Sequence, residues 1–287
     1  MKRIFLTLLL ASACGPRIDA NADGGSPALS STGGGDEGRP VIMPEADRQP
    51  DGTWLSGTVS VSQVSADGGE MGFALLGFTR YRSDPNARLS CQPVRFTGAT
   101  CELCNVDHGA STPVEEPVDP GPITITAAGH EWRLISHEGY ANTSITAPQL
   151  FSGGEPVTVR GEGSNAIPAF TIETVMTGVT HVVSPVVGRQ DSIALSRSAP
   201  YTFQWEHATD DMRLALHLES NDLTCVADPG STQLTLPATV ISQLPAGSGW
   251  FSLWPMRLVV AHAGDWPINI STYRGDGEFA GAGVTVQ

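Results

Sequence analysis

Lysine is almost missing from this 287-residue chain, because no second lysine follows Lys2. Enzymes that form Schiff bases need a lysine amine, and the phosphate-binding loop GxxxxGK[ST] contains one. A Ser-Lys dyad depends on a lysine as well. The sequence therefore excludes these three kinds of site. A GC-rich genome explains the same preference for arginine without any functional cause.

Clusters of basic residues are missing too. The chain has 16 Lys and Arg against 30 Asp and Glu, which gives a formal net charge of −14. Proteins that bind nucleic acid displace counterions with patches of Lys and Arg, and no cluster of arginines occurs here. We therefore expect no nucleic acid partner.

The N-terminal apolar run is too short to cross a bilayer, which takes about 20 residues. It begins at Ile4 after two basic residues and ends in small residues that lead to Cys14. A charged start, a short apolar run and a small-residue end are typical of an export signal, which we place at residues 1–13. The other interpretation is an ordinary secretory signal with a chance cysteine.

Aromatic residues are absent between Gly15 and Pro50, a segment rich in Gly, Pro and Ser. Such a composition buries too little apolar surface to offset the entropy of ordering. We expect residues 14–50 to form a disordered tether with a mean reach of about 30 to 36 Å. The folded part then stands clear of any membrane to which the N-terminus is attached.

Helical periodicity is nearly absent, and the only helix candidate is 238–244, between two prolines. Alternation of apolar and polar residues dominates instead, and it predicts many short strands separated by Gly and Asp turns. The clearest examples are 58–62, 123–126, 157–160, 201–206, 212–219, 268–271 and 284–286. The sequence therefore predicts an all-β protein, an antiparallel β-sandwich. Its length favours two immunoglobulin-like lobes, which we place at 51–151 and 152–287.

Four cysteines remain besides Cys14: Cys91, Cys101, Cys104 and Cys225. An even number in an exported chain predicts two disulfides with three possible connectivities. We favour Cys91 with Cys101 and Cys104 with Cys225, because Cys101 and Cys104 are too close in an extended stretch to pair with each other. Zinc bound by Cys91, Cys101, Cys104 and His108 is the alternative, and disulfides are favoured over it in an oxidising compartment.

Motifs for catalysis and metal binding are also lacking. His130 and His137 are seven residues apart, whereas HExxH needs four, and no GxSxG turn occurs. The acidic residues Asp210, Asp211, Asp222 and Asp228 lack the spacing of a calcium loop. We therefore expect no cofactor, no metal and no active site, although a site assembled from distant residues escapes this kind of analysis.

Tryptophan provides one functional signal. Trp250, Trp254 and Trp266 lie close together near the C-terminus, and exposed aromatic rings stack on sugars in many β-sandwich modules. The same residues, with Trp205, can instead fill a core, and core packing is the favoured interpretation. The three tryptophans are therefore candidate sugar-stacking residues whose exposure decides between the two roles.

Two resemblances to known proteins follow from these residues. The run Ala11-Ser12-Ala13-Cys14 resembles the lipobox of bacterial lipoproteins, which implies a lipid-bearing Cys14 and a membrane partner. Gly15 rather than Asp after this cysteine is compatible with transport to an outer membrane in a host that has one. Segments around Cys91, 98–104, 153–157, 167–170, 203–205, 224–225 and 236–238 are similar to uncharacterised secreted lipoproteins of myxobacteria and related bacteria. This similarity implies an exported β-sandwich lipoprotein and supplies no activity.

Three functions remain open at this point. The first is a non-catalytic envelope or cell-surface lipoprotein with a structural or adhesive role. The second is a carbohydrate-binding module that holds envelope or extracellular polysaccharide. The third is a secreted hydrolase with an unrecognised site. Exposed tryptophans favour the second, and a pocket that joins His, Ser and carboxylates favours the third.

Overall fold

The computed structural model describes residues 48–66, 69–145, 151–186, 191–206, 210–275 and 280–287. The predicted export signal and Cys14 lie outside these residues, as does the predicted tether apart from its last three residues. In the described part of the chain, no helix is long and apolar enough to cross a membrane.

The fold is all-β, as predicted, and its single short helix in the described residues is α1 (Ala238–Ile241). The strands follow each other in the order β1 (Trp54–Ala66), β2 (Gly69–Tyr81), β3 (Leu89–Phe96), β4 (Ala99–Val106), β5 (Glu115–Pro117), β6 (Ile123–Ala127), β7 (His130–Leu134), β8 (Tyr140–Ile145), β9 (Pro156–Gly161), β10 (Phe170–Val175), β11 (His181–Ser184), β12 (Ser192–Leu195), β13 (Tyr201–Glu206), β14 (Asp211–Leu218), β15 (Asn221–Ala227), β16 (Gln233–Leu236), β17 (Gly247–Ala263), β18 (Trp266–Gly275) and β19 (Ala280–Val286). All seven segments with clear alternation lie in strands, except that 212–219 extends one residue beyond the end of β14.

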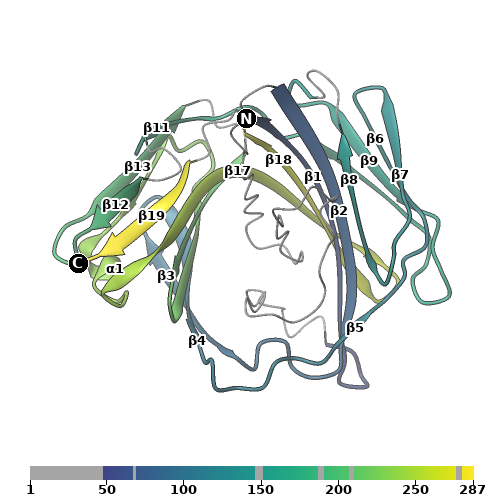
Figure 1. Cartoon of the computed structure of the whole chain (residues 1–287), viewed down its shortest axis with the longest axis horizontal. Coiled ribbons are helices and arrows are strands. Elements are labelled where there is room, and N and C mark those ends of the chain that lie inside the picture. Colours follow the sequence, from purple (N-terminus) through teal and green to yellow (C-terminus); the bar gives the residue numbers. More distant parts are fainter. Residues whose placement is uncertain (1–47, 67–68, 146–150, 187–190, 207–209, 276–279) are drawn as a thin grey trace, which may run out of the picture.

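One large sheet dominates the architecture. Its main path runs β3-β4-β15-β14-β17-β18-β1-β2-β5, and β8, β12 and β19 pair beside this path. We call it the long sheet. Its pairs are antiparallel except β1 with β18 and β12 with β19. Figure 1 shows that it curves strongly, with a four-stranded sheet (β10-β9-β6-β7) and a three-stranded sheet (β11-β13-β16) lying outside the curve.

Two hydrophobic cores lie between the long sheet and the two small sheets. The first packs β1, β2 and β18 against the four-stranded sheet, with Phe78, Ile125 and Ile270 fully buried. The second packs β14, β15 and β17 against the three-stranded sheet and α1, with Phe203 and Leu214 fully buried. The molecule is thus two β-sandwiches that share one sheet. Burial of each such side chain stabilises the fold by roughly 1.5 to 3 kcal/mol.

The two cores do not divide the chain at residue 152, where the sequence placed the boundary. The first core contains Ile125 together with Val159 and Ile270, and the second contains Leu103 together with Leu214. The physical reason is strand pairing, because β9 adds to β6 in one small sheet and β4 adds to β15 in the long sheet. Each sandwich therefore takes strands from both sides of the predicted boundary.

Strand β17 connects the sandwiches. Its first half pairs with β14 and β19 in one sandwich, and its second half pairs with β18 in the other. At the junction, Arg257 donates hydrogen bonds to the buried carboxylate of Asp210, with its Nε 2.7 Å from Oδ1. The other Asp210 oxygen accepts from the Gly178 amide at 3.2 Å. A continuous strand and a buried ion pair thus link the two cores.

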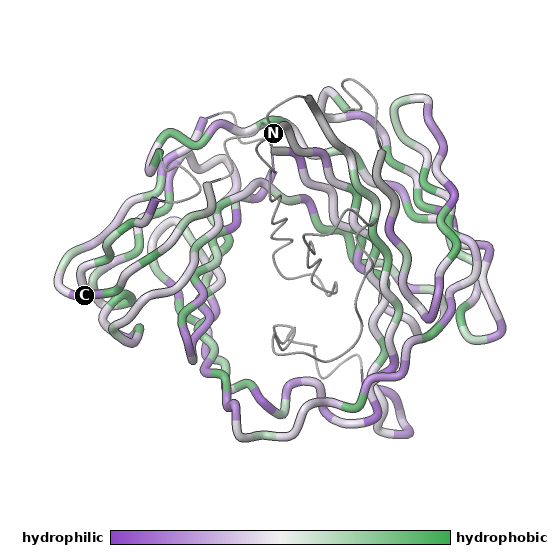
Figure 2. The backbone as a smooth tube through the Cα atoms, in the orientation of Figure 1, coloured by the Kyte–Doolittle hydropathy of each residue, from purple (hydrophilic) through white to green (hydrophobic). Residues whose placement is uncertain are grey.

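Hydropathy alternates along the strands, as Figure 2 shows by its green and purple bands. The sequence assigned one set of side chains to a core and the other set to water. The first assignment is confirmed, since Phe203 and Trp205 are fully buried. The second is wrong for β1, where Thr58, Ser60 and Ser62 are also buried. Ser62 lies directly between Phe73 and Tyr273 on the neighbouring strands, and these larger side chains flank the small hydroxyl.

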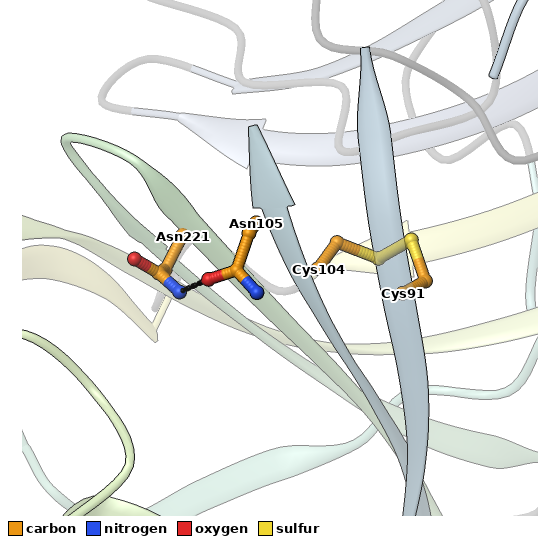
Figure 3. Close-up of a disulfide and its surroundings, with 4 residues drawn as sticks. All are labelled: Cys91, Cys104, Asn105 and Asn221. Atoms are coloured by element: carbon orange, nitrogen blue, oxygen red, sulfur yellow. Dashed lines mark hydrogen bonds between the residues drawn. A yellow bond between two sulfur atoms is a disulfide. The ribbon is translucent and has the colours of Figure 1, made fainter. Parts of the chain in front are cut away.

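The four cysteines form two disulfides, as predicted, but the favoured connectivity is wrong. Cys91 pairs with Cys104 and Cys101 pairs with Cys225. Register is the reason, because Cys91 lies opposite Cys104 on β3 and β4, and Cys101 lies opposite Cys225 on β4 and β15. Successive strand residues alternate in direction, so Cys101 and Cys104 point to opposite faces of the long sheet. Figure 3 shows Cys91 and Cys104 bonded across the two strands, next to the hydrogen-bonded Asn105 and Asn221.

Candidate functional site

The long sheet has a second face that points away from both cores. Along each central strand, the residues that alternate with core residues lie on this face, which lines the inside of the curve in Figure 1. We call it the concave face. Its central residues are Arg213, Ala215 and His217 of β14, Trp250, Ser252, Trp254 and Met256 of β17, Ser271 and Tyr273 of β18, Ser60 and Ser62 of β1, and Phe73 of β2.

Apolar and aromatic side chains form a cluster in the middle of this face. Trp254, Met256 and Tyr273 pack together with Ala215, and Phe73 and Leu258 pack against them from the edge. This cluster is separate from both sandwich cores. The concave face therefore combines aromatic rings with the hydroxyl groups of β1 and β18, a combination that suits ligands with both apolar and polar surfaces.

Titratable side chains lie at one end of the concave face. His217 is buried, and its Nδ1 is 2.8 Å from Oδ1 of Asp222 on β15. Ser252 lies diagonally from His217 on the next strand, because Ala215 pairs with Ser252 and His217 pairs with Trp250. The residue types of a Ser-His-Asp triad therefore share one face. Within the described residues, however, no hydrogen bond joins Ser252 to His217.

Hydrogen-bond donors without partners are concentrated on the same face. Within the described part of the chain, six residues have a buried side-chain N or O atom that makes no hydrogen bond, and three of them are Ser62, Arg213 and Trp250. Burial lowers the pKa of the Arg213 guanidinium, and the charge of Asp211 opposes that shift. An unpaired buried polar group costs roughly 1 to 3 kcal/mol, so three on one face need an explanation.

The three candidate sugar-stacking tryptophans do not form one platform. Trp250 and Trp254 lie on the concave face, where Trp250 is half-buried and Trp254 is 6% exposed. Trp266 belongs to the first core, with its indole N–H bonded to the Ala166 carbonyl. The interpretation that they fill a core is thus confirmed for Trp266. Trp254 is buried too, in the apolar cluster with Met256 and Tyr273. Sugar stacking stays a prediction for Trp250.

A recess of about 480 Å³ lies at one end of the first sandwich and is lined by Trp266 and several polar residues. Asp51, Arg80 and Asp265 contribute charged groups to it. The backbone amide and the hydroxyl of Thr53 donate to Asp51, and these hydrogen bonds hold the pKa of Asp51 below its ordinary value. Asp51 therefore carries a negative charge at neutral pH.

The candidate metal ligands of the sequence do not converge on one point. Asp210 bonds to Arg257 and Asp222 bonds to His217, so these carboxylates serve different parts of the fold. The three cysteines considered for zinc are all in disulfides, and Nε2 of His108 lies 3.0 Å from the carbonyl oxygen of Glu219.

Sequence reasoning missed Arg213 and His217 as parts of a site. Alternation in 212–219 marked them as the polar set of a strand, which is correct, but assigned that set to water. In the sequence, Arg213 and His217 each lie two positions from a small residue, Ala215. This pattern indicates a site only once β17 pairs with β14 and places Trp254 beside Arg213 and Trp250 beside His217.

No protein-family model and no curated protein matches this chain. Among solved structures, SGBP-B of the Bacteroides ovatus mixed-linkage glucan utilization locus, in complex with a mixed-linkage heptasaccharide, matches 78% of this chain with 12% identity and a TM-score of 0.21. This chain covers 65% of its length. A Ca²⁺-stabilized adhesin with which an Antarctic bacterium binds ice matches 77% of this chain with 11% identity and a TM-score of 0.17, and 49% of that chain is covered. Scores this low assign neither a family nor a ligand to the protein.

Proposed function

We propose that this protein is a lipid-anchored, non-catalytic protein of the bacterial cell envelope that uses the concave face of the long sheet for adhesion. The observation that carries the proposal is the composition of that face, where aromatic rings, hydroxyl groups and unpartnered donors occur side by side. The sequence supports the anchor, because residues 1–13 followed by Cys14 have the pattern of a lipoprotein signal. Attachment at the outer membrane follows from the same signal and from Gly15.

The second candidate function is carbohydrate binding, which names a polysaccharide as the partner to which the protein adheres. Sugars offer apolar ring faces for stacking and hydroxyl groups for hydrogen bonds, so they complement a surface with both features. Trp250, which is half-buried, provides a ring, and Ser60 provides a hydroxyl on a neighbouring part of the face. The polysaccharide then lies across several strands of the long sheet.

A blocking substitution on the concave face tests this function. Val260 lies on this face and is 56% exposed, so Val260→Glu adds a charged side chain without disturbing a core. Val183→Glu is the matched control, because Val183 is 44% exposed on β11 of a small sheet. We expect the full-length protein and the control to retain envelope polysaccharide coated on beads. The Val260→Glu variant is expected to retain several-fold less. Equal retention by all three proteins contradicts adhesion through the concave face.

The hydrolase alternative rests on His217, Asp222 and Ser252, and we expect it to fail. Panels of ester, glycoside and peptide substrates should show no turnover by the full-length protein, because Ser252 does not bond to the histidine that has to activate it. Ser252→Ala is the diagnostic variant and Ser271→Ala on the same face is its control. Activity that Ser252→Ala abolishes and Ser271→Ala retains establishes a hydrolase and refutes the non-catalytic role.

A further inference from the structure

Four large side chains on the concave face surround two small ones. Strands β14 and β17 pair so that Arg213 lies opposite Trp254, Ala215 opposite Ser252, and His217 opposite Trp250. We call the four large residues, Arg213, His217, Trp250 and Trp254, the frame. Ala215 and Ser252 form its floor and are 0% and 1% exposed.

Two of the frame residues hold N–H groups that have no acceptor. Nε of Arg213 and Nε1 of Trp250 are both buried and make no hydrogen bond among the described residues. Arg213 also forms no ion pair within the described chain, and Asp211 is the carboxylate that influences it electrostatically. The two residues occupy diagonal corners of the frame, about four residues apart along the strands. At about 3.3 Å per residue, this separation is about 13 Å.

Apolar substitutes of similar size exist for both residues, and they satisfy the same packing without an unpaired donor. Phenylalanine keeps an aromatic ring at position 250, and methionine keeps the stem length at position 213. Replacing an unsatisfied buried donor by an apolar group is neutral or stabilising in the free protein. The N–H groups therefore add nothing to the stability of the free fold, and a bound acceptor explains their presence.

A guanidinium without an ion pair is complementary to a carboxylate, which it binds through two parallel N–H···O bonds. The far corner of the frame is suited to a sugar ring, because Trp250 lies there and is half-buried. One sugar residue spans about half of the distance between the corners, so two consecutive residues fit. Most of the net charge of −14 does not act on a ligand here, because charges beyond about 8 to 10 Å are screened at physiological ionic strength. Asp211 is the nearby carboxylate that opposes an acidic ligand at Arg213.

We propose that the frame is a subsite for an acidic polysaccharide, in which Arg213 binds the carboxylate of one uronic acid residue and Trp250 donates a hydrogen bond to the adjacent sugar. The subsite rests on the carbohydrate-binding function proposed above. It specifies in addition that the polysaccharide is negatively charged. It distinguishes chains of uronic acids from neutral chains of the same geometry.

Two matched oligosaccharides test the charge. The β-1,4-linked hexamer of mannuronate and the β-1,4-linked hexamer of mannose differ at the carboxylate that replaces each CH₂OH group. Calorimetric titration of the full-length protein in detergent should show at least about tenfold tighter binding of the mannuronate hexamer, equivalent to about 1.4 kcal/mol. Arg213→Met should remove this preference, and Trp250→Phe should weaken both affinities about tenfold. The controls Arg133→Met and Trp132→Phe on β7 should bind like the unaltered protein.

Thermal unfolding without ligand separates a binding role from a structural one. Residues that stabilise the fold lower the Tm when replaced, whereas Arg213→Met and Trp250→Phe should leave it unchanged or raise it. A lowered Tm for both variants overturns the inference, and so does equal affinity for the two hexamers. Binding of envelope polysaccharide without preference for mannuronate leaves the adhesive function standing and removes only the acidic subsite. If the unaltered protein does not retain polysaccharide on the beads, the carbohydrate-binding function on which the subsite rests is refuted.

Discussion

Removing the disulfide between Cys101 and Cys225 by changing both to Ala should lower the free energy of unfolding by about 5 kcal/mol. This bond closes a loop with a sequence separation of 124 residues, and the entropy that a crosslink removes from the unfolded chain grows with loop length. It also lies inside the second core, where both cysteines are at most 2% exposed. We therefore expect unfolding at a much lower denaturant concentration.

The other disulfide is the matched control for this prediction. Cys91 and Cys104 are separated by only 13 residues, so replacing both by Ala should cost about 3 kcal/mol. Urea unfolding of the two double variants and of the unaltered protein, each oxidised, gives the comparison. A larger loss for the short-loop pair contradicts the ranking. Mass spectrometry of the oxidised protein should find none of the four cysteines free.

Changing Cys14 to Ala should abolish membrane attachment. If signal cleavage leaves Cys14 as a lipid-bearing N-terminus, each buried CH₂ of its acyl chains contributes roughly 0.8 kcal/mol, and several chains hold the protein on the bilayer. In a Gram-negative host, the unaltered protein should sediment with membranes and incorporate labelled palmitate. The Cys14→Ala variant should do neither.

Cys91→Ala is the control for the anchor, because it removes a cysteine of the folded part and leaves the signal intact. It should still incorporate palmitate and sediment with membranes. Palmitate uptake that survives in Cys14→Ala would falsify the lipoprotein assignment. Sedimentation without palmitate uptake in the unaltered protein would show that a protein partner, and not lipid, holds it at the membrane.

The sequence by itself determined the all-β class and the existence of most strands. Alternation is a local signal, since side chains on a strand point to opposite faces every second residue, and the segments 123–126 and 201–206 show it without help from distant residues. The short helix between Pro237 and Pro245 was also predicted from a local pattern, since prolines mark both of its ends. The helix α1 ends at Ile241 and not at 244. The even number of cysteines similarly predicted that two disulfides form.

The tertiary structure decided which strands pair, and with them the connectivity of the disulfides and the location of the candidate site. Cys101 bonds to Cys225 because β4 lies beside β15 in one register, which no local pattern contains. The same pairing rules place Trp250 beside His217 and leave Trp266 in a core, although the three tryptophans are close in sequence. Alternation tells which residues share a face of a strand. The pairing of β14 with β17 and the curvature of the long sheet decide the rest. They place Arg213, His217 and the other residues of that set together on the concave face.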